Sequence, residues 1–211
     1  MLLILSGILL ALGMIFHPGM AAPDYAATPA WAPVHMLLGF SALFGLAGLA
    51  GLFGVMNVNL RFLGKAAFGL ALLANVLLTG LMFFVEASIL PVLARDAAYQ
   101  PLASLNGPLM TGALGTAIGI TMVIAAAGYL LLAWYLVDSR MISVANGILF
   151  IGAPLLVFSP PLSFGFGVIG GLLLGAGIAW LGISIRVGLA HRSLESTLRV
   201  QDECLAHLGH A

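Results

Sequence analysis

The sequence has very few charged residues. Its 211 residues include seven basic and seven acidic side chains, whereas hydrophobic residues make up 62% and the mean hydropathy is +1.18. Soluble domains carry about 25% charged residues and about 45–50% apolar ones. Fourteen charges cannot cover a water-exposed surface of this size, which excludes a soluble globular domain, a disordered chain and a nucleic-acid-binding protein. The composition predicts an integral membrane protein, with the lipid bilayer as its first partner.

Several features that would identify an activity are also missing. Cys204 is the single cysteine, so a disulfide within the chain is impossible. The sequence contains no His-Glu-x-x-His motif, no Gly-x-Ser-x-Gly motif and no P-loop. It also has no arginine ladder in an apolar segment. These absences favour a non-enzymatic function over a zinc protease, a serine hydrolase, an ATP-driven pump or a voltage sensor.

Long apolar runs take the place of these motifs. A helix needs about 20 residues to cross a bilayer, and the runs lack the alternation of membrane barrel strands. We therefore predict an all-α polytopic membrane helix bundle with about six transmembrane helices in residues 1–188, followed by an amphipathic cytoplasmic tail at 189–211. The expected spans are residues 2–16, 35–56, 62–94, 109–137, 141–158 and 162–187.

The basic residues predict the orientation of these spans. Cytoplasmic loops of membrane proteins are enriched in lysine and arginine. With six spans, Arg95 alone falls on one side, which predicts that both termini lie in the cytoplasm. The other side holds Arg61, Lys65, Arg140, Arg186, Arg192 and Arg199. A cleaved signal peptide ending near Met20-Ala21-Ala22 is the alternative for the first span, but no basic residue precedes its apolar core.

Glycine is abundant, with 27 residues, and recurs at helical spacing. Small residues at every fourth position let two membrane helices approach closely. Packing within the bundle is the favoured interpretation, and a homodimer or a larger membrane complex is the alternative. The small-residue faces contain Gly167, Gly171, Gly175 and Ala179 in the last span, Gly115 and Gly119 in the fourth, and Ala47 and Gly51 in the second.

Glu86 is the central candidate for a site because it is the one carboxylate well inside a predicted span. At about 100° per residue, Asn75 and Thr79 fall on the same helix face. His17 closes the first span and His35 opens the second, on the side where Glu86 lies. We expect these five residues to form a ligand- or proton-binding pocket near the outer face.

The helix dipole predicts different roles for the two histidines. His35 in a first turn is expected to be neutral, and His17 in a last turn is expected to be favoured as a cation. Simpler interpretations stand beside these: a Glu86–His35 contact that fixes helix register, histidines at the membrane interface, and Trp31 as an aromatic-belt anchor. Asn75 and Thr79 are also typical of hydrogen bonds between helices.

A cofactor is not required by the sequence, and two alternatives remain. His17 and His35 are candidate axial ligands of a haem for electron transfer. His17, His35 and Glu86 are a candidate zinc set, although their spacing is not diagnostic.

Four short features occur in order near the ends of the predicted spans: His17-Pro18, Trp31-x-x-x-His35, Glu86 and Asn106-Gly107-Pro108. In this pattern the chain resembles a loose group of small, uncharacterised bacterial integral membrane proteins with about six helices. The resemblance implies a bacterial inner membrane and no activity. The residues favour a small-solute or proton-handling pocket, with a haem protein and an accessory subunit of a larger complex as alternatives.

Overall fold

The computed structural model describes the backbone of residues 1–19, 25–157 and 164–208, and side chains up to residue 188 except that of residue 59. These parts of the chain contain helices and no strand, which confirms the predicted all-α class. Four of their helical segments are long and apolar enough to cross a membrane. They are α2 (Trp31–Met56), Phe62–Arg95, α7 (Ala113–Asp138) and the Phe164–Gly188 part of α11 (Phe164–Leu208).

Two of the six expected spans are shorter than the helices of membrane-spanning length. The first is α1 (Leu2–Ile15), and the fifth is divided into α8 (Val144–Leu149) and α9 (Gly152–Val157). Pro154 explains the division, because proline donates no backbone hydrogen bond and its ring clashes with the carbonyl of Phe150 four residues earlier. The structure therefore has an apolar helix at each of the six expected places, four of them of membrane-spanning length.

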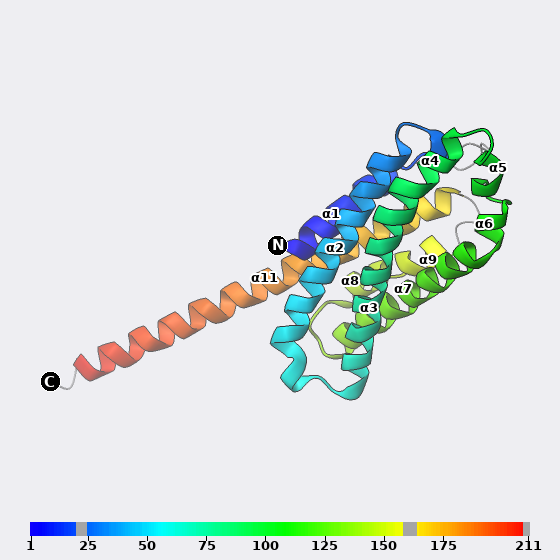
Figure 1. Cartoon of the computed structure of the whole chain (residues 1–211). Coiled ribbons are helices and arrows are strands. Elements are labelled where there is room, and N and C mark those ends of the chain that lie inside the picture. The colour runs from blue at the N-terminus through cyan, green and yellow to red at the C-terminus, as the bar shows by residue number, and fades with distance from the viewer. Residues whose placement is uncertain (20–24, 158–163, 209–211) are drawn as a thin grey trace.

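Several helix boundaries differ from the predicted ones. Helix α2 begins at Trp31 instead of His35, since Pro33 fits the first turn of a helix. The fourth span is interrupted at Gly112, between α6 (Pro108–Thr111) and α7. Helix α11 continues without a break past residue 188 (Figure 1). The amphipathic character predicted for 189–211 rests on side chains outside the described part of the chain.

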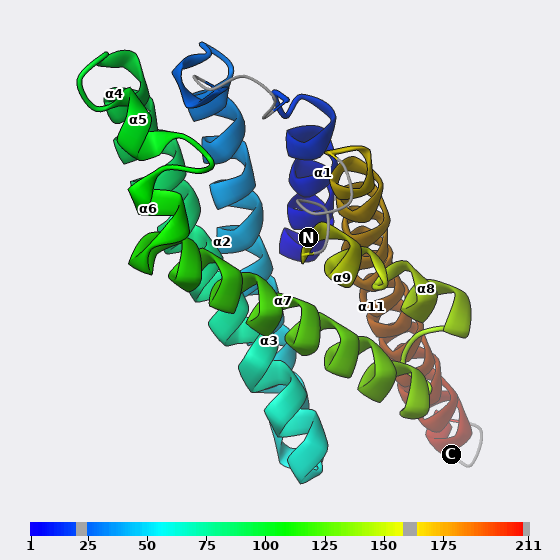
Figure 2. The same ribbon diagram turned by 90° about the vertical axis from the view of Figure 1, so that its right-hand side faces the viewer.

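The long segments pack side by side in the order of the chain. Helix α1 lies between α2 and α11, and α2 also packs against the segment formed by α3 (Phe62–Gly80) and η3 (Leu81–Ile89) (Figures 1 and 2). Helix α3 packs against α7, and α9 fills the angle between α7 and α11. These contacts enclose a space between α1, α2, α3, α7 and α11.

Close backbone contacts explain part of the glycine content. A Cβ atom added at Gly175 would lie 2.6 Å from the carbonyl oxygen of Gly7, where α1 and α11 meet. Gly171 packs against the Met14 side chain in the same way. The glycine face of the last span therefore packs inside the bundle, as expected. Gly51 and Gly119 differ, because a Cβ atom at either position would meet no atom within 4 Å.

Short helices cover the end of the bundle where α1 finishes. They are η1 (Tyr25–Ala27), α4 (Leu90–Arg95) and α5 (Gln100–Ala103). The Tyr25 hydroxyl donates a hydrogen bond of 3.1 Å to the Ala103 carbonyl, and both residues are buried. This bond joins the segment before α2 to the segment after α4, so that the two cover the space between the helices at this end.

Candidate functional site

A cavity of about 770 Å³ lies in the space between the helices. It begins beside Trp31 and His17 at the covered end and extends to Tyr129 and Leu174 deeper in the bundle. Most of its wall is formed by leucine, isoleucine, methionine and alanine side chains. A volume of this size and an apolar wall with few polar groups are typical of small-molecule sites.

His35 faces this cavity from the second turn of α2, with only 3% of its surface exposed. Its Nδ1 lies 2.8 Å from the Trp31 carbonyl oxygen. A carbonyl only accepts hydrogen bonds, so Nδ1 carries a proton and donates it. In the neutral imidazole, Nε2 is then an acceptor, and it lies 3.8 Å from Oε2 of Glu86. The backbone of α2 thus fixes the orientation of the ring and directs one nitrogen toward the carboxyl group.

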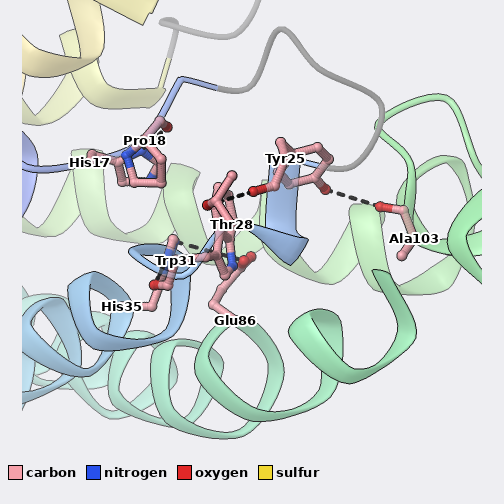
Figure 3. Close-up of polar contacts among 8 residues, drawn as sticks. All are labelled: His17, Pro18, Tyr25, Thr28, Trp31, His35, Glu86 and Ala103. Carbon is pink, nitrogen blue, oxygen red and sulfur yellow. Dashed lines mark hydrogen bonds and ion pairs between the residues drawn. The ribbon is translucent and has the colours of Figure 1, made fainter. Parts of the chain in front are cut away.

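Glu86 lies in a π-helical segment, η3, which interrupts the third span. Its turns are closed by i→i+5 bonds and contain about one residue more than α-helical turns. The segment ends at Ile89, shortly before Pro91, whose ring would clash with a regular i→i−4 carbonyl. The wider turns change the direction of the Glu86 side chain relative to an uninterrupted α-helix. Glu86 consequently points toward α2 and His35 (Figure 3).

This π segment corrects the predicted polar stripe. Asn75 and Glu86 both line the cavity, but Thr79 is not among the lining residues. The Thr79 hydroxyl donates a hydrogen bond of 2.7 Å to the Asn75 carbonyl in its own helix. The prediction assumed an α-helical rotation of 100° per residue from Asn75 to Glu86. Because η3 has more residues per turn, Glu86 does not have the direction relative to Thr79 that this assumption gives.

His17 lies beside this pair but does not have the expected charge preference. Its ring centroid is 4.9 Å from that of His35 and 5.3 Å from that of Trp31. Burial lowers the pKa of His17, and its hydrogen bond to the Pro18 carbonyl only partly offsets that effect. The prediction that His17 is favoured as a cation is therefore wrong, because loss of hydration on burial disfavours the charged ring.

Trp31 is a site residue that the sequence prediction missed. It was expected at the membrane interface, but only 2% of its surface is exposed, and its ring stacks on His35 at 4.2 Å. Its indole Nε1 is buried and makes no hydrogen bond of standard geometry, although it interacts with the Glu86 carboxyl. The spacing Trp31-x-x-x-His35 places both residues on one helix face, a signal that the sequence does contain.

Tyr25 completes the covered end of the cavity. Figure 3 shows its side chain together with those of His17, Trp31, His35 and Glu86. Its ring meets that of Trp31 at 4.8 Å. Burial raises the pKa of Tyr25 to about 12, and the nearby Glu86 carboxylate adds to the rise. Tyr25 is therefore a neutral hydrogen-bond donor whose proton is directed to Ala103.

A second polar group lies deeper in the cavity, where α3 meets α7. The Asn75 side-chain amide donates to the Tyr129 hydroxyl at 2.9 Å and to the Ala71 carbonyl at 2.8 Å. The Tyr129 hydroxyl lies 3.2 Å from Oδ1 of Asn75. Nearby, the Ser41 hydroxyl donates to the Ser6 carbonyl at 2.8 Å. The hydrogen bonds of this deeper group are made within the protein, as predicted for Asn75.

The two cofactor hypotheses can be compared with this geometry. A haem held by two histidines needs one ring on each face of the macrocycle. The rings of His17 and His35 contact each other, and the Nδ1 atom of each lies 2.8 Å from a backbone carbonyl oxygen. This arrangement leaves no room for a macrocycle between them. The described residues also contain no group of three or more His, Cys, Asp or Glu side chains placed to hold a metal ion.

Comparison with known proteins adds no family to this description. The chain matches no family model, no curated protein and no solved structure. The geometry of the cavity is therefore the basis for the function proposed below.

Proposed function

We propose that this membrane protein binds a small molecule in the cavity and exchanges a proton with it through Glu86 and His35. The observation that carries the proposal is the approach of Nε2 of His35 to Oε2 of Glu86, at 3.8 Å, inside a cavity of about 770 Å³. Two titratable groups from different helices are rarely retained at this depth in a membrane protein without a function.

The contact between the two side chains supports a proton-exchanging role. At 3.8 Å the pair is too far apart for a direct hydrogen bond. One proton on Glu86 leaves both groups neutral, and the same proton on His35 creates an ion pair. A bound ligand with a polar hydrogen can complete the link between the two atoms. The pair is then the place where a ligand and the protein exchange a proton.

The proposal includes the predicted topology. We place α1 and the α8–α9 segment as the first and fifth of six spans, with both termini in the cytoplasm of a bacterial inner membrane. The position of α1 between α2 and α11 supports this count. Most basic residues whose side chains are described lie away from Glu86: Arg61, Lys65 and Arg140 at helix ends, and Arg186 near the end of the apolar part of α11. The positive-inside rule then puts Glu86 near the outer face.

Infrared difference spectroscopy between two pH values tests this proposal without a known ligand. The protein in lipid nanodiscs should show the carbonyl stretching band of a protonated carboxyl that titrates. We expect the band to disappear in Glu86→Gln and to persist in the control Asp96→Asn, which removes an exposed carboxylate from the loop after α4. His35→Gln should shift the titration of the same band.

Two results would contradict the proposal. A spectrum that is the same in Glu86→Gln and in the unsubstituted protein would show that Glu86 does not titrate. Loss of Glu86→Gln from the membrane, with Asp96→Asn retained, would show that the Glu86–His35 contact mainly holds α2 and η3 together.

A further inference from the structure

The polar groups of the cavity lie at two levels, and most of the unused hydrogen-bonding capacity lies at one of them. At the deeper level, Asn75, Tyr129 and Ser41 are bonded to one another or to backbone carbonyls. At the covered end, the buried Nε1 of Trp31 lacks a hydrogen bond of standard geometry. The Nε2 atom of His35 and the Glu86 carboxyl have no direct hydrogen bond to each other. The polar part of a ligand therefore belongs at the covered end.

The available groups at this end include both a donor and acceptors. Trp31 Nε1–H can only donate a hydrogen bond. His35 Nε2 accepts when the ring is neutral, because Nδ1 donates to the Trp31 carbonyl. A hydroxyl group satisfies both at once, since its oxygen accepts and its hydrogen is donated. A buried donor without a hydrogen bond of standard geometry is costly, and Trp31 Nε1 has only its interaction with the Glu86 carboxyl, so such a ligand improves its bonding.

The cavity is poorly suited to a charged head group. No lysine or arginine is found among the described residues that line it, so a phosphate or carboxylate finds no permanent positive partner there and meets Glu86. A permanent cation could pair only with an ionised Glu86, and recognition of a quaternary ammonium group usually also requires open aromatic faces. One face of Trp31 is stacked on His35, and its remaining ring contacts are with Tyr25 and His17. The head group that fits these surroundings is neutral.

The rest of the cavity is suited to an apolar chain. From the covered end its wall continues along aliphatic and methionine side chains of α1, α2, α3 and α11 toward the Asn75–Tyr129 pair. Representative lining residues are Leu10, Met14, Leu38, Leu78, Leu174 and Ile178. Since Asn75 and Tyr129 are already bonded to each other, this part of the cavity offers a ligand mainly packing contacts, together with the Ser6 hydroxyl.

We infer that the cavity binds a lipophile with a single apolar chain and a neutral hydroxyl-bearing head, alcohol or phenol. Its oxygen accepts the hydrogen bond of Trp31 Nε1, and its hydrogen is donated to Nε2 of His35. The hydroxyl can take the proton of Glu86 as it gives its own to His35, so that the proton passes between the two side chains and the ligand stays neutral. The chain lies along the aliphatic wall between α1, α2, α3 and α11. This inference rests on the proposed function and names the class of its ligand.

Three probes with the same chain and different heads test the inference: dodecanol, dodecanoate and dodecyltrimethylammonium. The amount of radiolabelled probe retained by nanodiscs that contain the protein is measured, and the amount retained by empty nanodiscs is subtracted to correct for partition into lipid. We expect dodecanol to bind most tightly. Trp31→Phe keeps the ring and removes the donor, and should weaken dodecanol binding about five- to thirtyfold, the effect of one buried hydrogen bond.

Two further variants serve as the control and as the test of chain placement. Trp134→Phe changes an exposed tryptophan on α7 and should leave dodecanol binding unchanged. Ala125→Leu adds volume to the wall below the head site. It should weaken the binding of dodecanol more than that of octanol, whose shorter chain does not reach as deep.

The outcomes separate this inference from the proposed function. Glu86-dependent binding of dodecyltrimethylammonium or dodecanoate in preference to dodecanol would overturn the neutral-head inference and leave the pocket in place. Equal dodecanol binding by Trp31→Phe and the unsubstituted protein would overturn it as well. Absence of binding of all three probes, with the infrared band of Glu86 intact, would overturn the ligand class alone. If that band is also missing, both proposals fail.

Discussion

At the scale of single residues, burial explains why some side chains differ from the roles that the sequence predicts for them. His17 lies at a helix end, where the dipole favours a cation, yet loss of hydration lowers its pKa. Trp31 is a residue type typical of the membrane interface, yet it is buried inside the protein, and its Nε1 makes no hydrogen bond of standard geometry. Neither result is visible in the sequence, because both depend on segments that pack over these residues from elsewhere in the chain.

The lowered pKa of His17 predicts how stability depends on pH. The unfolded state, with an ordinary pKa of 6.5 for this group, binds a proton more readily than the folded state. The contribution of neutral His17 is therefore complete above that pH and is lost as the pH falls through and below it. Thermal unfolding in nanodiscs from neutral to acidic pH should show a steeper loss for the unsubstituted protein than for His17→Asn. Parallel curves, or a steeper loss in His17→Asn, would contradict this.

The Asn75–Tyr129 pair gives a prediction about folding. Tyr129→Phe removes the hydroxyl that bonds the Asn75 side chain and leaves Oδ1 of Asn75 without that partner. We expect a loss of about 0.5–2 kcal/mol in the free energy of unfolding, in the range measured for hydrogen bonds between membrane helices. Tyr135→Phe is the control, because the Tyr135 hydroxyl makes no hydrogen bond within the described part of the chain. Equal stability of the two variants in denaturant titrations would show that the pair does not stabilise the α3–α7 contact.

At the scale of helices, the apolar runs and the proline positions predicted where most helices lie. They did not predict the irregularities within those helices. The runs predicted helices at each of the six places, because a lipid-facing backbone must bond within its own segment. Pro33 was assigned to a loop although it fits a first helical turn. The π segment around Glu86 was missed, since its wider turns depend on local bonding that hydrophobic periodicity does not report. This one irregularity changed the direction of the Glu86 side chain relative to α3, and Glu86 points toward His35.

Glycine contacts between helices supply a matched pair of substitutions. A Cβ atom at Gly175 would lie 2.6 Å from the Gly7 carbonyl oxygen, so Gly175→Ala forces α1 and α11 apart. We expect this variant to lose about 1–3 kcal/mol of stability, as in other overpacked contacts. Gly51→Ala should lose nothing, because a Cβ atom there has no neighbour within 4 Å. Equal thermal stability of the two variants would contradict the described α1–α11 packing.

At the scale of the whole molecule, composition was sufficient to predict a helical membrane protein, and the structure gives four helices of spanning length. The number of spans and the location of the termini remain predictions. The cavity itself was beyond the sequence, because its wall comes from α1, α2, α3, α7 and α11 together. Among the expected site residues, the structure brings His17, His35, Asn75 and Glu86 to the cavity and leaves Thr79 outside it.

Cysteine labelling tests the proposed orientation. In a Cys204→Ser background, Asp96→Cys follows α4 near Glu86, and Ser139→Cys follows α7 at the opposite end of the bundle. We expect a membrane-impermeant maleimide to label Asp96→Cys in intact cells or spheroplasts. Ser139→Cys should be labelled only after the inner membrane is opened. The reverse pattern would invert the topology, and labelling of both positions in intact spheroplasts would refute six spans.

The central claim is that the Glu86–His35 end of the cavity is a ligand site, and one measurement tests it most directly. The infrared carboxyl band of Glu86 is recorded at constant pH before and after dodecanol is added to the protein in nanodiscs. The account predicts a shift of this band in the unsubstituted protein and in Trp134→Phe, a much smaller shift at the same dodecanol concentration in Trp31→Phe, and no band in Glu86→Gln. A Glu86 band that dodecanol leaves unchanged, under conditions where labelled dodecanol is retained by the protein, would contradict it.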